Sequence, residues 1–172
     1  MQQMKAVSAK NFLRIMMKDQ LTAFLYSLVM DTYSFGYSSS GFTDMPMNHK
    51  VFLAQFDAIK KLASEGPCVM VGRCADYALS EYKDCFSVFV HADTDWRINR
   101  LSQKHNKTAK EAKDMINKTD KSRSSYYNYY TNKKWGAASS YNLCVDSSKL
   151  GIDGAAKAII QAIEIFDSIK NK

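Results

Sequence analysis

The chain has 172 residues, of which 46% are hydrophobic and 24% charged, and a formal net charge of +7. This length suits one globular domain, or one domain with a small appendage. No stretch approaches the roughly 20 apolar residues that a membrane span needs. The opening MQQMKAVSAKNF also lacks the apolar region of a signal peptide. We therefore expect a cytoplasmic protein without a membrane partner, and its positive charge suits an anionic ligand.

The four cysteines are scattered and none forms a C-x-x-C pair. We expect small buried thiols in a reducing compartment, and not a disulfide framework. The three histidines lack metal-ligand spacing, either with the cysteines or with each other. No metal site is predicted from these residues.

The first half of the chain predicts two helices separated by a loop. Apolar residues at helical spacing indicate a helix over residues 9–30, and the serine, glycine and aromatic residues of 31–47 indicate a loop. Asn48 is expected to cap the next helix, which Gly66 and Pro67 should end.

Three short, nearly all-apolar runs then predict strands, and helical patterns alternate with them. The strands are expected at 68–72, 86–91 and 141–146. Helices are expected at about 75–81 and after a cap at Thr94. A long helix should run from a Thr108–Glu111 capping box to about residue 125, and a last one should span 153–169. Apolar strands alternating with helices favour an α/β fold with a parallel sheet that is covered on both faces.

Polar residues follow each predicted strand, at the edge of the sheet where ligands of such folds bind. The three strand ends read Gly72-Arg73, His91-Ala92-Asp93 and Asp146-Ser147-Ser148. The guanidinium of Arg73 suits a phosphate or a carboxylate. Its sequence position also allows a local ion pair with Asp76.

Two further groups of charged residues stand on predicted helices. Arg97 and Arg100 share a helix face because they are three residues apart, and that face either turns toward the strand ends or is solvated. Asp120 and Arg123 repeat this spacing in DKSRSSYYNYYTNKKWG. The tyrosines and lysines of this segment can stack on bases and hold phosphates, or the tyrosines can pack the helix onto the sheet.

Four motifs taken together resemble the cytidylate kinase-like family, relatives of the P-loop nucleoside monophosphate kinases. They are VGRCADYAL, VFVHAD-x-x-x-R-x-x-R, DKSR-x-x-YY-x-x-YT-x-x-x-W and YNLCVDSS, and the resemblance extends over about residues 24–166. It implies one such domain over residues 1–172, with 94–135 as a lid-like helical segment. It also implies phosphoryl transfer from ATP, with Mg²⁺, to a nucleoside monophosphate such as CMP.

The resemblance assigns roles to eight residues. Those predicted to bind the acceptor nucleotide are Arg73, Asp76, Asp120 and Arg123; those predicted to act on the transferred phosphoryl group are Arg97 and Arg100; those predicted near the adenine of the cofactor are Ser147 and Ser148. Cytidylate kinases carry an aspartate where this chain has Cys74, and Asp76 is the candidate to replace it.

One family feature is absent from the sequence. The phosphate-binding signature G-x-x-x-x-G-K-[ST] does not occur, and Gly36 and Gly41 have no lysine beside them. We therefore expect a three-layer sheet of the P-loop kinase type that lacks its N-terminal strands. Its open strand edges would be closed by direct pairing of the remaining strands, by a second copy of the chain, or by an upstream segment.

The resemblance leaves three functions to compare. The first is a nucleoside monophosphate kinase-type transferase, with nucleoside mono- and triphosphates as partners. The second is a nucleotide-binding module without catalysis, because loss of the phosphate loop removes transition-state stabilisation. The weakest alternative is a nucleic-acid-binding protein that uses residues 120–135.

Overall fold

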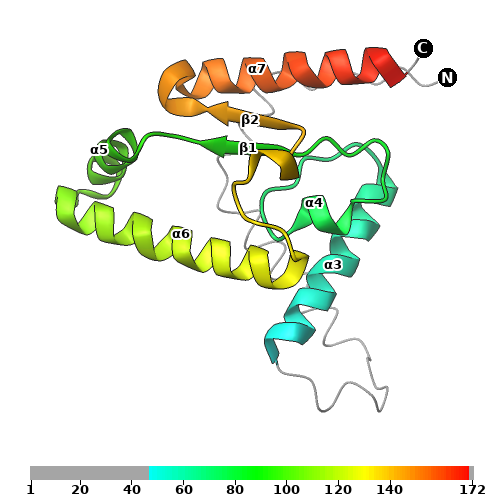
Figure 1. Cartoon of the computed structure of the whole chain (residues 1–172), viewed down its shortest axis with the longest axis horizontal. Helices are drawn as coiled ribbons and strands as arrows, with labels where there is room; N and C mark the ends of the chain where they lie inside the picture. The colour runs from blue at the N-terminus through cyan, green and yellow to red at the C-terminus, as the bar shows by residue number, and fades with distance from the viewer. Residues whose placement is uncertain (1–46, 171–172) are drawn as a thin grey trace. The chain divides into compact units, whose positions relative to one another are not determined.

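The computed structural model describes residues 47–170, which belong to two compact units that meet in the sequence at Cys85 and Phe86 (Figure 1). The first unit contains α3 (Met47–Glu65) and α4 (Ala75–Ala78). The second contains, in order, β1 (Val88–His91), α5 (Thr94–His105), α6 (Ala109–Thr131), the 3₁₀ helix η1 (Ala138–Ser140), β2 (Leu143–Asp146) and α7 (Ser147–Lys170). The helix predicted at 9–30 and the loop predicted at 31–46 lie outside the described residues.

The first unit is built by packing α3 against α4. Its buried core consists of Ile59, Ala75, Ala78 and Leu79, with Phe56, Ala63, Met70 and Cys85 packed around it. The predicted end of α3 is confirmed, because the helix stops at Glu65 and Gly66 has a φ of 148°. The predicted cap is wrong, since α3 begins at Met47 and Asn48 is already helical.

The strand predicted at 68–72 is not formed. Residues 67–71 have no regular structure, and the sheet in the described part of the chain has two strands, β1 and β2. An apolar run becomes a strand only when a neighbouring strand pairs with its backbone groups. The following helix is also shorter than predicted and ends at Ala78.

The predicted strands at 86–91 and 141–146 are confirmed as β1 and β2, each with its start two residues later than expected. The two strands run parallel, with Val88 opposite Leu143 and His91 opposite Asp146. The Asn142 side chain accepts hydrogen bonds from the Ser87 backbone and hydroxyl, both at 2.8 Å. This contact fixes the register just before the strands begin.

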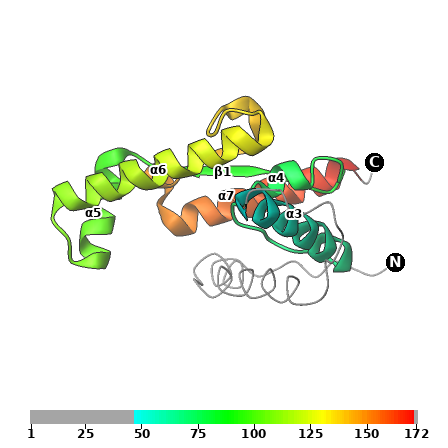
Figure 2. The ribbon, with the colours of Figure 1, turned by 90° about the horizontal axis from the view of Figure 1, so that it is seen from below.

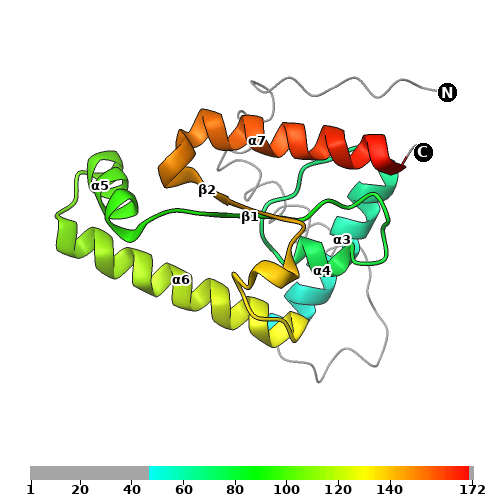
Figure 3. The same cartoon turned by 45° about the horizontal axis from the view of Figure 1, so that its top comes forward.

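Helices lie on both sides of the strands in the second unit. Figures 1 and 3 show α7 and α6 on opposite sides of β1 and β2. Phe86 packs on Phe166 of α7, with ring centroids 5.1 Å apart. Phe89 instead contacts Trp135 and Tyr141, at 5.4 and 5.0 Å. This architecture is a mixed helix and strand fold with a small parallel sheet.

The α5–α6 hairpin extends from the carboxyl end of β1, and its two helices pack on each other (Figure 2). The predicted Thr108–Glu111 capping box is confirmed, with both reciprocal hydrogen bonds present. The helix continues to Thr131, beyond the predicted end near 125. The Thr94 cap is wrong, because α5 already includes Thr94 and Asp93 occupies the cap position without a side-chain cap bond.

The last helix begins earlier than predicted. α7 starts at Ser147, directly after β2, and is kinked at Gly151, whose φ of 68° and ψ of 173° are not helical. The predicted segment 153–169 is therefore the straight part after the kink. No helix within residues 47–170 has the length and apolar character to cross a membrane.

Candidate functional site

The carboxyl end of β1 leads directly into α5 and so positions Arg97. β1 ends at His91, and Arg97 lies in the first turn of α5, where its backbone N–H donates to the Asp93 carbonyl at 3.0 Å. The guanidinium is thus held near the edge of the sheet where parallel α/β folds bind ligands.

Arg97 and Asp120 form a bidentate ion pair between α5 and α6. Nη1 donates to Oδ2 at 2.7 Å and Nη2 donates to Oδ1 at 2.8 Å. The two side chains are 30% and 25% exposed. Charge-assisted pairs of this geometry are stronger and more directional than ordinary hydrogen bonds. The structure therefore brings together two predicted site residues that are 23 positions apart in sequence.

Arg100 and Arg123 are more exposed than Arg97 and Asp120, the predicted site residues next to them in the sequence. Arg100 is exposed and lies over the ring of Trp96, with its guanidinium carbon 5.4 Å from the ring centroid. Arg123 is exposed on α6, three residues beyond Asp120. Arg97 is bound to α6 through its hydrogen bonds to Asp120, whereas Arg100 contacts a ring of its own helix. The two arginines, predicted to share one helix face, therefore have different contacts: Arg97 binds α6 and Arg100 packs on its own helix.

Arg73 belongs to the first unit and stands in an unusual turn. Gly72, Arg73 and Cys74 have φ values of 71°, 57° and 56°, and all three therefore lie in the left-handed region. Such conformations cost a non-glycine residue about 1–2 kcal/mol. The turn is closed by the Ala75 N–H, which donates to the Gly72 carbonyl at 3.1 Å. It holds the Arg73 side chain exposed.

Cys74 and Asp76 follow this arginine, at the cap and in the first turn of α4. Burial and the nearby Asp76 carboxylate raise the pKa of the Cys74 thiol to about 11, and Arg73 offsets this only in part. Cys74 is therefore a protonated, packed side chain at neutral pH. Asp76 lies in the first turn of α4, half-buried. The expectation of buried thiols is right for Cys74 and wrong for Cys68, which is exposed.

Ser147 and Ser148 tie the ends of the two strands together. The Ser147 hydroxyl donates to the His91 carbonyl at 2.9 Å. The Ser148 hydroxyl donates to Asp146 Oδ1 at 2.5 Å and accepts from the Asp93 backbone N–H at 3.2 Å. The hydroxyl bond from Ser148 lowers the pKa of Asp146. Both serine hydroxyls thus have partners inside the protein at the edge where the cofactor was predicted.

Sequence reasoning missed Lys149 at this edge. Its Nζ donates to Asp93 Oδ2 at 3.0 Å, and this bond raises the pKa of Lys149. Its position could have identified it, because Lys149 follows the Asp146-Ser147-Ser148 strand end directly. The cation is more than half exposed and links the segment after β1 to the start of α7.

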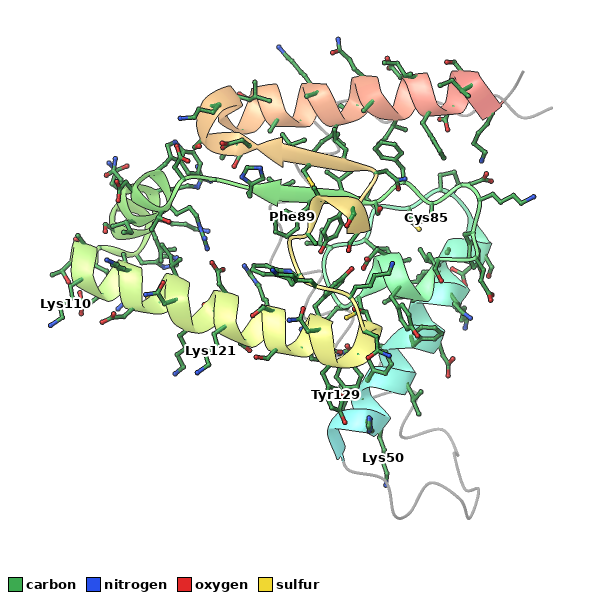
Figure 4. All side chains as sticks on the ribbon, viewed as in Figure 1. Lys50, Cys85, Phe89, Lys110, Lys121 and Tyr129 are labelled. Carbon is green, nitrogen blue, oxygen red and sulfur yellow. The ribbon has the colours of Figure 1, made fainter. Side chains whose placement is uncertain are left out.

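The tyrosine-rich end of α6 divides into packed and exposed residues. Tyr127 is buried, and its ring lies 6.2 Å from that of Tyr141, next to Phe89. Gly136, with a φ of 76°, leaves room for Phe89, because a Cβ there would lie 3.2 Å from the ring. Figure 4 labels Phe89 between the strands and α6. The prediction that tyrosines pack this helix onto the sheet is correct for Tyr127, whereas Tyr129 is 68% exposed.

The described residues do not by themselves provide a metal centre. Within 47–170 there is no group of three histidine, cysteine or acidic side chains that could hold a metal ion. Mg²⁺ usually binds through one or two carboxylates together with substrate phosphates and water. A group of three protein ligands is therefore not required for the implied Mg²⁺, and its binding stays a prediction.

Comparison with known proteins adds a family to this geometry. The model of the cytidylate kinase-like family matches residues 3–149. The chain belongs to the cytidylate kinase-like family. The match begins and ends earlier in the sequence than the motifs suggested. Membership of this family indicates a kinase-like, nucleotide-related function.

Relatives with assigned activities do not refine this further. No curated protein matches the chain. Among solved structures, an uncharacterized protein from Eubacterium ventriosum ATCC 27560 is 32% identical, with a TM-score of 0.65, and the similarity covers 69% of this chain and 74% of that one. This neighbour supports the α/β fold and carries no named activity.

Proposed function

We propose that this chain is a nucleoside monophosphate kinase-type phosphotransferase domain that acts in the cytoplasm, with a CMP-like acceptor and ATP as donor. The observation that carries the proposal is the Arg97–Asp120 pair next to the carboxyl end of β1, in a member of the cytidylate kinase-like family. A guanidinium held at this edge is suited to a phosphate, and a carboxylate beside it can accept hydrogen bonds from a sugar or base.

The proposed chemistry needs no covalent intermediate. Phosphoryl transfer is catalysed mainly by positioning and by neutralising the charge on the phosphoryl oxygens. Arg97 would supply this charge when a phosphate takes the place of the Asp120 carboxylate on its donors, and Arg100 would add a second cation from the same helix. Arg123, on the same helix as Asp120, would hold the acceptor phosphate. Asp120, released from Arg97, would contact the acceptor sugar or base.

The family architecture is proposed to be completed outside the described residues. Leu143 N–H donates to the Ser87 carbonyl, so by strand alternation the backbone groups of Val88 and Val90 point to the other edge of β1. We propose a three-layer sheet of the P-loop kinase type, in which a further strand pairs with this edge. That strand would come from elsewhere in the protein or from a second copy.

A non-catalytic nucleotide-binding module is the second candidate, and the missing phosphate-loop signature favours it. Backbone N–H donors and the loop lysine supply most of the electrostatic stabilisation in P-loop enzymes. The same arginines would then bind a nucleotide without turning it over.

One experiment separates these functions. Calorimetry measures CMP binding, and a coupled assay measures ADP release from ATP and CMP. We expect Arg97→Gln to weaken CMP binding about tenfold to a hundredfold, the usual range for a charged hydrogen-bonded pair. Lys157→Gln, an exposed change on α7, should leave it unaltered. Binding without ADP release identifies the module. Absence of CMP binding to the wild-type protein contradicts both functions.

A further inference from the structure

The positive charge of the chain is concentrated in the α5–α6 hairpin and the turn after it. Residues 97–134 contain 11 lysines and arginines and 3 acidic residues, a net charge of +8, whereas the other 134 residues contain 13 basic and 14 acidic residues, a net charge of −1. The two values add to the +7 of the whole chain. The proposed phosphotransfer site uses only the arginines of this excess, and the lysines have no role in it.

The outer face of α6, defined by Lys110, Lys118, Lys121 and Tyr129, carries much of this unused charge. All four residues are exposed. Figure 4 shows Lys110, Lys121 and Tyr129 on the side of α6 that is turned away from the strands. Within the described residues none of the three lysines forms an ion pair, not even with Asp114, which lies four positions from both Lys110 and Lys118. The outer face therefore presents three cations and the single carboxylate of Asp114 to solvent, a net positive charge.

The length of the outer face excludes a mononucleotide as its ligand. Lys110 and Tyr129 are separated by 19 positions along one helix, which corresponds to about 28 Å. A single nucleotide can reach only neighbouring side chains on such a surface. A ligand that uses all of these cations must itself be an extended polyanion.

Tyr129 indicates which polyanion fits. Its ring is 68% exposed and stands edge-on to Tyr130, at 4.9 Å between centroids and an angle of 88°. An exposed aromatic ring in line with lysines is the combination that binds single strands, in which cations follow the backbone and rings stack on bases. We propose that the outer face of α6 binds single-stranded nucleic acid, with the three lysines on phosphates and Tyr129 stacked on a base. This activity is separate from the proposed phosphotransfer.

Fluorescence anisotropy with a labelled oligouridylate of about 12 nucleotides, within the usual site size for single strands, tests the proposal on the full chain. Three phosphate contacts predict that the logarithm of the binding constant falls with the logarithm of salt concentration with a slope of about −2. This measurement needs no variant. A slope near zero, or no binding at about 50 mM salt, contradicts the proposal.

A matched pair of triple variants locates the binding surface. Lys110→Gln/Lys118→Gln/Lys121→Gln should weaken binding at least about tenfold at low salt and flatten the slope. Lys61→Gln/Lys83→Gln/Lys157→Gln removes the same charge from exposed positions outside the hairpin and should change affinity less than about twofold. Equal losses in the two variants mean that net charge alone attracts the oligonucleotide, and they overturn the proposal.

A Tyr129 variant and competing ligands test the role of base stacking and the location of the site. Tyr129→Ala should weaken binding about fivefold or more without changing the salt slope, whereas Tyr82→Ala should not. CMP in excess should not displace the oligonucleotide. Displacement by CMP places the oligonucleotide in the nucleotide site, and stronger competition by duplex DNA or inorganic polyphosphate removes the role of stacking. Either result rejects the outer face of α6 as a single-strand site.

Discussion

The two faces of α6 use similar residue types for different purposes. On the inner face, Asp120 forms a bidentate pair with Arg97, and Tyr127 is buried beside Tyr141. On the outer face, Lys118 and Lys121 are exposed and Tyr129 lies mostly in solvent. The inner face has fixed geometry because each group has a partner in the protein. The outer face leaves its charge available to a ligand.

This difference separates two kinds of anion recognition. A site that positions one phosphate for chemistry needs a guanidinium whose orientation is set before the ligand arrives, as the bonds to Asp120 set that of Arg97 until a phosphate replaces them. A surface that follows a flexible polyanion needs spaced cations without fixed partners. The following variants test whether the two faces really differ in this way.

The largest effect is expected from removing a tyrosine ring on the inner face. Tyr127→Ala should lower the free energy of unfolding by about 3–5 kcal/mol, because it deletes a buried ring that packs the end of α6 near the sheet. Tyr129→Ala, two positions away, should lower it by less than about 0.5 kcal/mol. Urea unfolding followed by circular dichroism measures both. Comparable losses would show that the two faces are not distinct.

A smaller effect is expected from the ion pair. Asp120→Ala leaves the partly buried Arg97 without its partner and should cost about 1–2 kcal/mol, between the values for exposed and buried pairs. Asp114→Ala on the exposed side should cost no more than about 0.5 kcal/mol. A double-mutant cycle with Arg97→Gln isolates the coupling. If the coupling energy is zero, the pair does not fix the hairpin.

The smallest effect is expected at the start of α6, where both faces begin. The Thr108 backbone N–H and hydroxyl donate to the Glu111 carboxylate, each at 2.8 Å, and these bonds lower the pKa of Glu111 below its ordinary value of 4.5. A group with a depressed folded pKa stabilises the protein above its unfolded pKa, and loses this contribution as pH falls below 4.5 toward the folded pKa.

Thr108→Ala should therefore cost about 1 kcal/mol at neutral pH, as expected for loss of a cap, and should weaken the dependence of stability on pH below 4.5. Thermal unfolding compared with wild type, from neutral pH down to roughly two units below the carboxyl pKa, measures this change. Identical pH profiles for the two proteins would mean that the capping box does not set the Glu111 pKa.

Local signals predicted the local structure well. The Thr108–Glu111 box and the Gly66 stop were predictable because the interacting groups are adjacent in sequence. The strand predicted at 68–72 failed because an apolar run does not specify its pairing partner. Arg97 and Asp120 were each predicted as site residues from motifs, and their role in a site stays a prediction. Their pairing depends on how α5 packs on α6, which no pattern in the sequence specifies.

The serines after β2 show the same limit of sequence-based prediction, which places a residue but does not identify its distant partners. Ser147 and Ser148 could be placed at the edge of the sheet from the sequence, because they follow an apolar strand. Their partners, the His91 carbonyl and the Asp93 N–H, are 56 and 55 positions away. They become neighbours only through the parallel register of β1 and β2.

The most direct test of the proposed phosphate site is the effect of Asp120→Asn on two ligands, measured by calorimetry. The substitution keeps the shape of the side chain but removes the negative charge that holds Arg97. Pyrophosphate binding should become about threefold to tenfold tighter, because a like charge beside the anion is lost. CMP binding should become weaker, because the carboxylate contact to sugar or base is lost. If both affinities remain at wild-type values, Arg97 and Asp120 do not form the nucleotide site.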